Sequence, residues 1–118
     1  MTIGEFSKQT GICAYTLRFY ESKGLIRVKR DSGGRRDYDT NDVEWVQFLQ
    51  RLKDTGMPLR EIKQYADLRY LGPDTMAERM QLLQKHRETV LAQQKKWAVY
   101  LENLDHKIDL YRQELAKR

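Results

Sequence analysis

The stretch TIGEFSKQTGICAYTLRFYESKGLI, residues 2–26, predicts two short helices separated by a turn. Thr2 and Glu5 have the spacing of a capping box, in which two side chains satisfy free backbone N–H groups at a helix start. We therefore expect the first helix to begin near Ile3. Gly11 is placed to end it, because glycine readily adopts the left-handed conformation of a helix terminus.

The second helix should open near Cys13 or Ala14 and run to about Lys23, where Gly24 stops it. Helical spacing gives it an inward face made of Ile12, Leu17, Tyr20 and Leu25. Four residues are then left to face elsewhere, namely Tyr15, Thr16, Arg18 and Phe19.

A basic glycine turn, RDSGGRRDY at residues 30–38, follows directly and predicts a short hairpin. Its basic residues, with those just before it, are Arg27, Lys29, Arg30, Arg35 and Arg36. Two short helices followed by such a hairpin outline a winged helix-turn-helix, in which the second helix enters the DNA major groove and the wing lies beside it. Arg18 is then a candidate phosphate ligand, Tyr15 and Thr16 lie where base edges are approached, and Tyr38 has a hydroxyl to donate to a phosphate.

The same residues also fit a structural role. Arg18 can pair with Glu21 or Glu5 on a solvated face, and Tyr15 or Phe19 can cover core. The glycine turn can be an ordinary exposed loop, although five basic residues make this less favourable.

Charge is unevenly distributed along the 118 residues. The net charge is +5, and residues 1–38 hold eight basic against four acidic side chains. A basic face attracts the phosphate backbone through counterion release, so any such binding should weaken with salt. The excess of positive charge therefore lies mainly in residues 1–38, the segment for which DNA binding is predicted.

Several other classes are disfavoured by composition. No apolar run is long enough to span a bilayer, and no signal segment follows Met1, so we expect a cytoplasmic protein. Cys13 is the single cysteine, and with only His86 and His106 beside it we expect neither a disulfide framework nor a metal site. No nucleophile with its base, paired carboxylates or phosphate loop is present, so we expect no enzyme and no cofactor.

Two further helices are predicted before residue 72. Asp39 and Thr40 offer N-cap oxygens to a helix that ends at Gly56, and Pro58 should lie in the first turn of the next. The apolar faces of these helices are Val43, Val46, Phe48, Leu49 and Leu52, then Leu59, Ile62, Tyr65 and Ala66. Gly72-Pro73 then breaks the helix, which divides the chain into a DNA-binding domain, 1–72, and a last helix, 73–118.

The last helix carries an apolar seam that steps alternately by four and three residues. Its positions are Met76, Met80, Leu83, Arg87, Val90, Gln94, Trp97, Leu101, Leu104, Ile108, Tyr111 and Leu115. This heptad spacing is typical of a coiled coil and requires a partner helix. A homodimer is the simplest solution, either parallel or antiparallel; Leu83, Val90, Trp97, Leu101, Leu104, Ile108 and Tyr111 are the main predicted dimer contacts.

The first stretch, the GGRRDY turn and TGMPLREI at residues 55–62 together resemble the MerR family of dimeric bacterial transcription regulators, and the resemblance covers the whole chain. It implies a mainly α-helical protein with a winged helix-turn-helix and a long dimerisation helix, paired as an antiparallel coil. It also implies binding to a palindromic operator in a promoter spacer, where bending and untwisting the DNA activates or represses transcription by RNA polymerase.

The resemblance also implies site residues. Arg18 and Tyr20 match an Arg-Tyr-Tyr segment that contacts the DNA backbone, with Phe19 in place of its first tyrosine. Arg36 and Tyr38 match the arginine and tyrosine of the wing. Arg35 stands where the family usually has an aromatic residue, and Lys53 resembles a phosphate contact before the second wing.

The chain ending resembles the short branch of the family that responds to aldehydes and to nitrosative or thiol stress. The sensing cysteine of that branch lies just before TGM, and here Arg51 takes its place. Cys13 is the remaining redox candidate, since a helix N-terminus can stabilise a thiolate, but a cysteine can also simply replace a serine cap there. The rival to a regulator is a non-specific architectural or partition protein whose coil recruits another chain.

Overall fold

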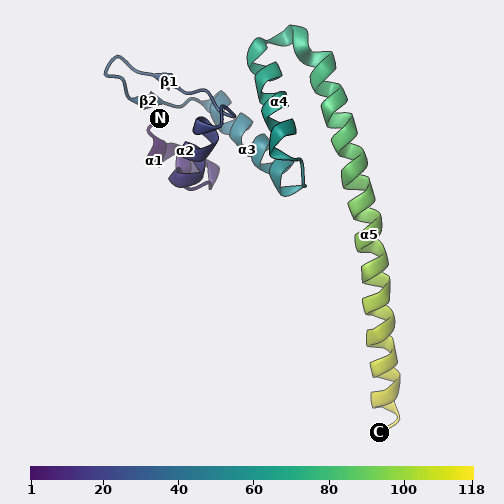
Figure 1. The fold of residues 1–118 in the computed structure, drawn as a ribbon. Coiled ribbons are helices and arrows are strands. Elements are labelled where there is room, and N and C mark those ends of the chain that lie inside the picture. The colour runs from purple at the N-terminus through teal and green to yellow at the C-terminus, as the bar shows by residue number, and fades with distance from the viewer. The chain divides into compact units, whose positions relative to one another are not determined.

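The structure is a computed structural model that describes residues 1–118 and is mainly helical, with one two-stranded hairpin (Figure 1). Its elements in chain order are α1 (Ile3–Thr10), α2 (Ala14–Ser22), β1 (Lys29–Arg30), β2 (Arg36–Asp37), α3 (Thr40–Asp54), α4 (Leu59–Leu71), the 3-10 helix η1 (Pro73–Thr75) and α5 (Met76–Ala116). None of the helices combines the length and apolar character that a membrane span requires.

The chain divides into two compact units, Met1–Leu83 and Gln84–Arg118. The sequence places the border at residue 72, before the last helix. The difference arises because Leu82 and Leu83, on the first turns of α5, pack against the core of the first unit. The start of α5 therefore belongs to the first unit.

The helix-turn-helix forms where its local signals predict it. The Thr2 hydroxyl accepts a hydrogen bond from the Glu5 N–H at 3.2 Å, which caps α1. Gly11 ends this helix with a φ of 74°, a left-handed conformation that costs glycine little. The α2 helix ends at Ser22, just before Gly24.

The hairpin pairs Lys29 with Asp37 and Arg30 with Arg36 in antiparallel register. Its turn is closed by the Asp31 carboxylate, which accepts hydrogen bonds from the N–H groups of Gly33 at 2.9 Å and Arg35 at 3.0 Å. The predicted wing is confirmed.

A full capping box begins α3, in which Asp39 and Asp42 each accept a backbone N–H of the other at 2.9 Å. At α4, Pro58 is the N-cap residue, one position before the first turn in which we expected it. Leu59, expected in the core, is 42% exposed because it is the first residue of that helix, ahead of the buried face that starts at Ile62.

The core of the first unit comes from every one of its larger elements. It comprises Phe6, Leu17, Tyr20, Leu25, Ile26, Tyr38, Trp45, Val46, Leu49, Leu52, Met57, Ile62, Tyr65 and Ala66. Trp45, which the periodicity did not place inward, is 4% exposed and donates its indole N–H to the Leu25 carbonyl at 2.9 Å. Val43 and Phe48 are only partly buried at its edge.

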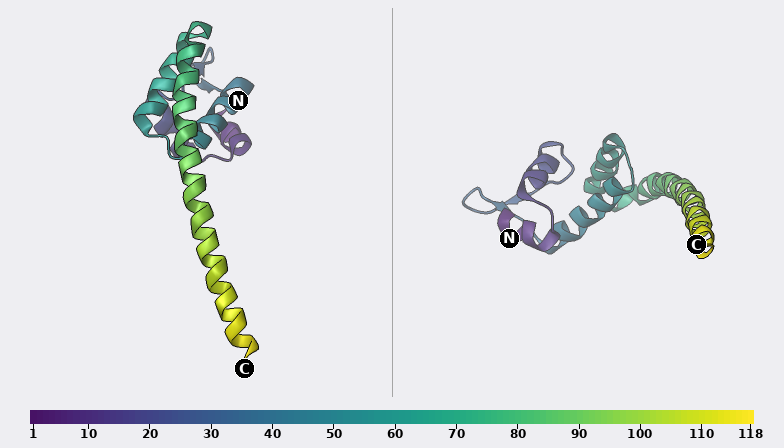
Figure 2. Two further views of the ribbon diagram at one scale, coloured as in Figure 1. Left: turned by 90° about the vertical axis from the view of Figure 1, so that its right-hand side faces the viewer. Right: turned by 90° about the horizontal axis from the view of Figure 1, so that it is seen from below.

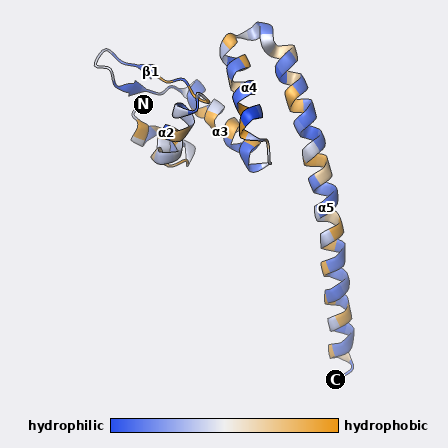
Figure 3. Cartoon of the chain, viewed as in Figure 1, coloured by the Kyte–Doolittle hydropathy of each residue, from blue (hydrophilic) through white to orange (hydrophobic).

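The α5 helix is continuous over 41 residues (Figure 2). Apolar residues recur along it between stretches of hydrophilic ones (Figure 3). Eight of the predicted seam residues are exposed large hydrophobics: Met76, Met80, Trp97, Leu101, Leu104, Ile108, Tyr111 and Leu115. Leu83 and Val90 are half-buried.

Candidate nucleic-acid interface

The α2 helix has one buried and one exposed face. Leu17 has no exposed surface, which fixes the rotation of the helix on the core. Tyr15 is 81% exposed at the N-terminal end of α2, and Arg18 is exposed and forms no ion pair. Phe19 is 39% exposed, and Thr16 is half-buried. These four side chains therefore lie outside the fully buried face of α2.

Tyr20 belongs to the buried face of α2. Its ring has no exposed surface, and its hydroxyl donates to the Gln50 amide oxygen at 2.6 Å. Burial raises the pKa of this hydroxyl. The phosphate contact that the resemblance implied for Tyr20 is not available in this conformation, because the hydroxyl already binds α3. Of the two predictions for Tyr20, the inward position given by the helical spacing agrees with the structure, and the phosphate contact implied by the resemblance does not.

Glu21 links α2 to the hairpin. Its carboxylate accepts a hydrogen bond from Arg36 Nε at 2.6 Å and lies 3.4 Å from Arg30. This bond is the main reason that the pKa of Arg36 is raised. Arg35, at the end of the turn, is exposed. From the sequence, Glu21 was expected only as a partner for Arg18. Its contacts with the wing could have been predicted only from the strand register, which brings Arg30 and Arg36 side by side.

Tyr38 follows the wing but points into the core. Its ring is 2% exposed and stacks on Phe6 with centroids 4.1 Å apart and planes 12° apart. The hydroxyl is buried without a hydrogen-bond partner, and burial raises its pKa. The expected phosphate contact of Tyr38 is therefore also unavailable in this conformation. Stacking on α1 is the role that the structure gives this ring.

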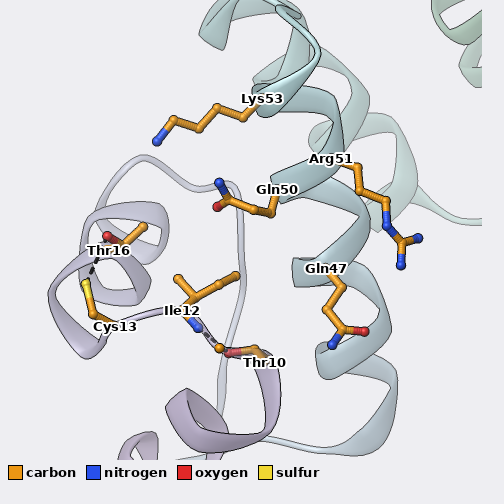
Figure 4. A pocket seen from close by; sticks show the side chains of 9 residues that line it. Thr10, Ile12, Cys13, Thr16, Gln47, Gln50, Arg51 and Lys53 are labelled. Atoms are coloured by element: carbon orange, nitrogen blue, oxygen red, sulfur yellow. Dashed lines mark hydrogen bonds between the residues drawn. The ribbon is translucent and has the colours of Figure 1, made fainter.

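Lys53 is exposed at the end of α3, with its ammonium 5.7 Å from the centroid of the Tyr20 ring. It borders a cavity of about 470 Å³ between the α1–α2 turn and α3. The lining residues are Thr10, Gly11, Ile12, Cys13, Thr16, Gln47, Gln50, Arg51 and Lys53. In Figure 4, Lys53 and Gln50 extend from α3 toward the turn, whereas Arg51 points away from it.

Cys13 is the N-cap residue of α2 and is exposed. Its sulfur lies 3.2 Å from the Thr16 hydroxyl oxygen, as Figure 4 shows. This hydrogen bond, together with the Thr16 N–H, lowers the pKa of the thiol. No three histidine, cysteine or carboxylate side chains gather where a metal ion could bind.

The fold and this surface define a winged helix-turn-helix DNA-binding protein. Residues 1–68 match the family described as the MerR HTH family regulatory protein, and residues 43–107 match its "MerR, DNA binding" region. The chain belongs to the MerR family of transcriptional regulators.

Similar proteins support this assignment along the whole chain. An uncharacterized HTH-type transcriptional regulator of Haemophilus influenzae is 38% identical over 98% of this chain and 86% of its own length. The regulator AdhR of Bacillus subtilis is 36% identical over 77% of this chain and 66% of its own length.

The crystal structure of HiNmlR, a MerR family regulator lacking the sensor domain and bound to promoter DNA, superposes with a TM-score of 0.86. It is 38% identical and is matched over 98% of this chain and 92% of its own.

Proposed function

We propose that this MerR-type regulator acts as a homodimer that binds a palindromic operator in a promoter spacer. Bending and untwisting of that DNA would then activate or repress transcription by RNA polymerase. The observation that carries the proposal is the exposed face of α2 beside a basic wing, on a chain that resembles a promoter-bound relative over nearly its full length. Since regulators act where chromosomal DNA lies, we place the protein in the cytoplasm.

Seven exposed or half-exposed side chains are proposed to face the DNA: Tyr15, Thr16, Arg18, Phe19, Arg35, Arg36 and Lys53. Six of them lie on α2 and the wing, the elements that enter or flank grooves in proteins of this fold, and Lys53 on α3 is a further basic residue for a phosphate. Tyr20 and Tyr38 act indirectly, by fixing α2 on α3 and the wing on α1.

The exposed seam of α5 supports the homodimer. Trp97, Leu101 and Leu104 are each more than half exposed in the single chain. A stripe of this length would be exposed to water in a monomer, whereas a second copy of the helix would cover it by knobs-into-holes packing.

An antiparallel arrangement fits the charges of α5 better than a parallel one. In a parallel pair, Arg87 would face Arg87 of the partner subunit inside the seam, and like charges there are costly. Residues 76–95 carry four basic and two acidic side chains, whereas residues 96–115 carry three basic and four acidic ones. Antiparallel pairing brings these oppositely charged halves together.

Binding of a DNA fragment from upstream of the protein's own gene tests the function. At physiological salt we expect this fragment to bind at least about a thousandfold more tightly than random DNA of equal length. Arg18→Ala should weaken binding, because it removes a phosphate contact, and should reduce the salt dependence by about one unit of slope. Arg112→Ala, which removes an exposed arginine of α5, is the matched control.

Equal affinity for the promoter fragment and random DNA would contradict the proposal and favour an architectural protein. A loss of melting temperature in Arg18→Ala as large as that of a core truncation would show that Arg18 stabilises the fold instead of contacting DNA.

A further inference from the structure

We infer that two copies of α5 pair in one particular antiparallel register, with the two-fold axis between residues 95 and 96, so that Val90 lies opposite Leu101 of the partner subunit. This inference rests on the homodimer proposed above and specifies which residues meet. The partner that covers the exposed seam of α5 is a second copy of this chain.

Heptad geometry restricts the choice of register. The seam positions form two classes, and in an antiparallel coil each residue of one class faces one of the other. The first class is Met80, Arg87, Gln94, Leu101, Ile108 and Leu115. The second is Met76, Leu83, Val90, Trp97, Leu104 and Tyr111. Allowed registers therefore differ by whole heptads.

Only the inferred register pairs every seam residue. Its layers are Met76 with Leu115, Met80 with Tyr111, Leu83 with Ile108, Arg87 with Leu104, Val90 with Leu101 and Gln94 with Trp97. A shift of one heptad in one direction leaves Met76 and Met80 without partners, and the opposite shift leaves Tyr111 and Leu115. All four are more than half exposed in the single chain, so either shift keeps apolar surface in water.

The polar residue Arg87 distinguishes the same registers. In the inferred one it lies opposite Leu104 of the partner subunit, one position from the exposed Asp105 of the partner subunit. One shift places Arg87 beside Arg112 of the partner subunit, and the other places it opposite Trp97. In the single chain its side chain is 70% exposed and lies 3.9 Å from Glu88, so its guanidinium is accessible to a partner.

The positions that flank the seam agree. In an antiparallel coil, residues that directly precede a seam residue of the first class meet each other, as do residues that directly follow one of the second class. This pairs Arg79 with Glu114 of the partner subunit, and Leu91 with Ala98 of the partner subunit. One shifted register would place Arg79 beside Lys107 of the partner subunit, and the other would place Leu91 beside Asp105. The inferred register is thus the one that gives Arg79 an acidic partner while Leu91 keeps an apolar one.

Disulfide trapping tests the register. In a Cys13→Ser background, Val90→Cys with Leu101→Cys places two thiols opposite each other across the dimer. The matched pairs are Val90→Cys with Ile108→Cys and Met80→Cys with Leu104→Cys, which report the two shifted registers. A disulfide needs Cα atoms within about 7 Å. Within one helix the cysteines of each pair lie about 16 Å or more apart along the axis, so bridges form only between chains.

We expect the Val90/Leu101 pair to give a covalent dimer on mild oxidation at least about tenfold faster than the other two pairs, because only its thiols meet the distance requirement. Circular dichroism checks that each variant is helical. Faster bridging of either matched pair, or no bridging of any pair in a chain that dimerises, would overturn the inference.

Sedimentation of the unmodified chain keeps the two proposals separate. If the chain is a dimer but a different cysteine pair bridges fastest, only the inferred register is contradicted. If the chain is a monomer at all concentrations, the proposed homodimer is contradicted as well. A charge exchange adds a second measurement: Glu114→Arg should weaken dimerisation about fivefold, and Arg79→Glu with Glu114→Arg should restore it. A double variant weaker than the single one would also overturn the register.

Discussion

At the scale of single residues, Glu21 joins two parts of the proposed DNA surface. One carboxylate binds Arg36 at 2.6 Å and Arg30 at 3.4 Å, which ties the wing to the helix that precedes it. Its side chain is only 22% exposed. An acidic group on a DNA-binding face opposes phosphate binding, so we attribute its presence to the orientation it gives the two arginines.

We predict that Glu21→Gln reduces the preference for promoter over random DNA about fivefold, the effect of losing roughly 1 kcal/mol of ion pairing. Affinity for random DNA should stay equal or rise, because a negative charge is removed. Titration of both DNAs under identical salt measures the ratio.

Glu5→Gln is the matched control, since Glu5 is exposed and forms no ion pair but carries the same charge. An equal loss of preference in both variants would mean that Glu21 acts only through charge and does not position the wing.

At the scale of elements, α3 begins at a capping box that directly follows the wing. Asp39 accepts the Asp42 N–H, and the Asp42 side chain accepts the Asp39 N–H, each at 2.9 Å. The hydrogen bond from the Asp42 N–H lowers the pKa of Asp39. The cap therefore fixes where the chain turns from the hairpin into the helix that carries Trp45 and Lys53.

Asp39→Ala should destabilise the fold by about 1 kcal/mol, because a backbone N–H loses its acceptor. For a domain of this size we expect a melting temperature about 4–8 °C lower. Calorimetry or thermal circular dichroism measures the change. Asp39→Asn keeps the acceptor oxygen and should cost much less; an equal loss in both variants would argue against capping as the cause.

At the scale of the whole molecule, dimerisation controls function if two reading heads must engage one operator. The seam residues Leu101, Leu104 and Ile108 of α5 are exposed in the single chain, and most residues of the opposite face are polar, with Val99 and Leu110 as exceptions. A charge in the seam should therefore prevent pairing without disturbing the first unit.

We predict that Leu101→Glu weakens dimerisation at least about a hundredfold, because each contact of Leu101 with Val90 of the partner subunit is replaced by a carboxylate buried against an apolar side chain, twice per dimer. Operator binding should fall with it, while the melting of the first unit is unchanged. Sedimentation equilibrium and DNA titration measure the two effects. Asn103→Glu adds the same charge beside the seam and should leave the dimer intact; loss of the dimer in this control would contradict the assigned face.

Local signals in the sequence determined the elements. Gly11, Gly24 and Gly72-Pro73 end helices because of their own backbone conformations, and the Thr2 cap starts one through its own hydroxyl. The basic turn and the heptad period are likewise properties of neighbouring residues. The winged helix-turn-helix, the long last helix and the family could all be predicted for that reason.

Only the tertiary structure decided which polar groups remain free for DNA. Tyr20 and Tyr38 were predicted to contact phosphates, yet Gln50 binds one hydroxyl and the core covers the other. Nothing in the sequence around Glu21 indicated its ion pair with Arg36, which forms because the hairpin folds back onto α2. These contacts join residues 15 or more positions apart, so no local periodicity reports them. Packing across elements fixed which of the predicted side chains face outward.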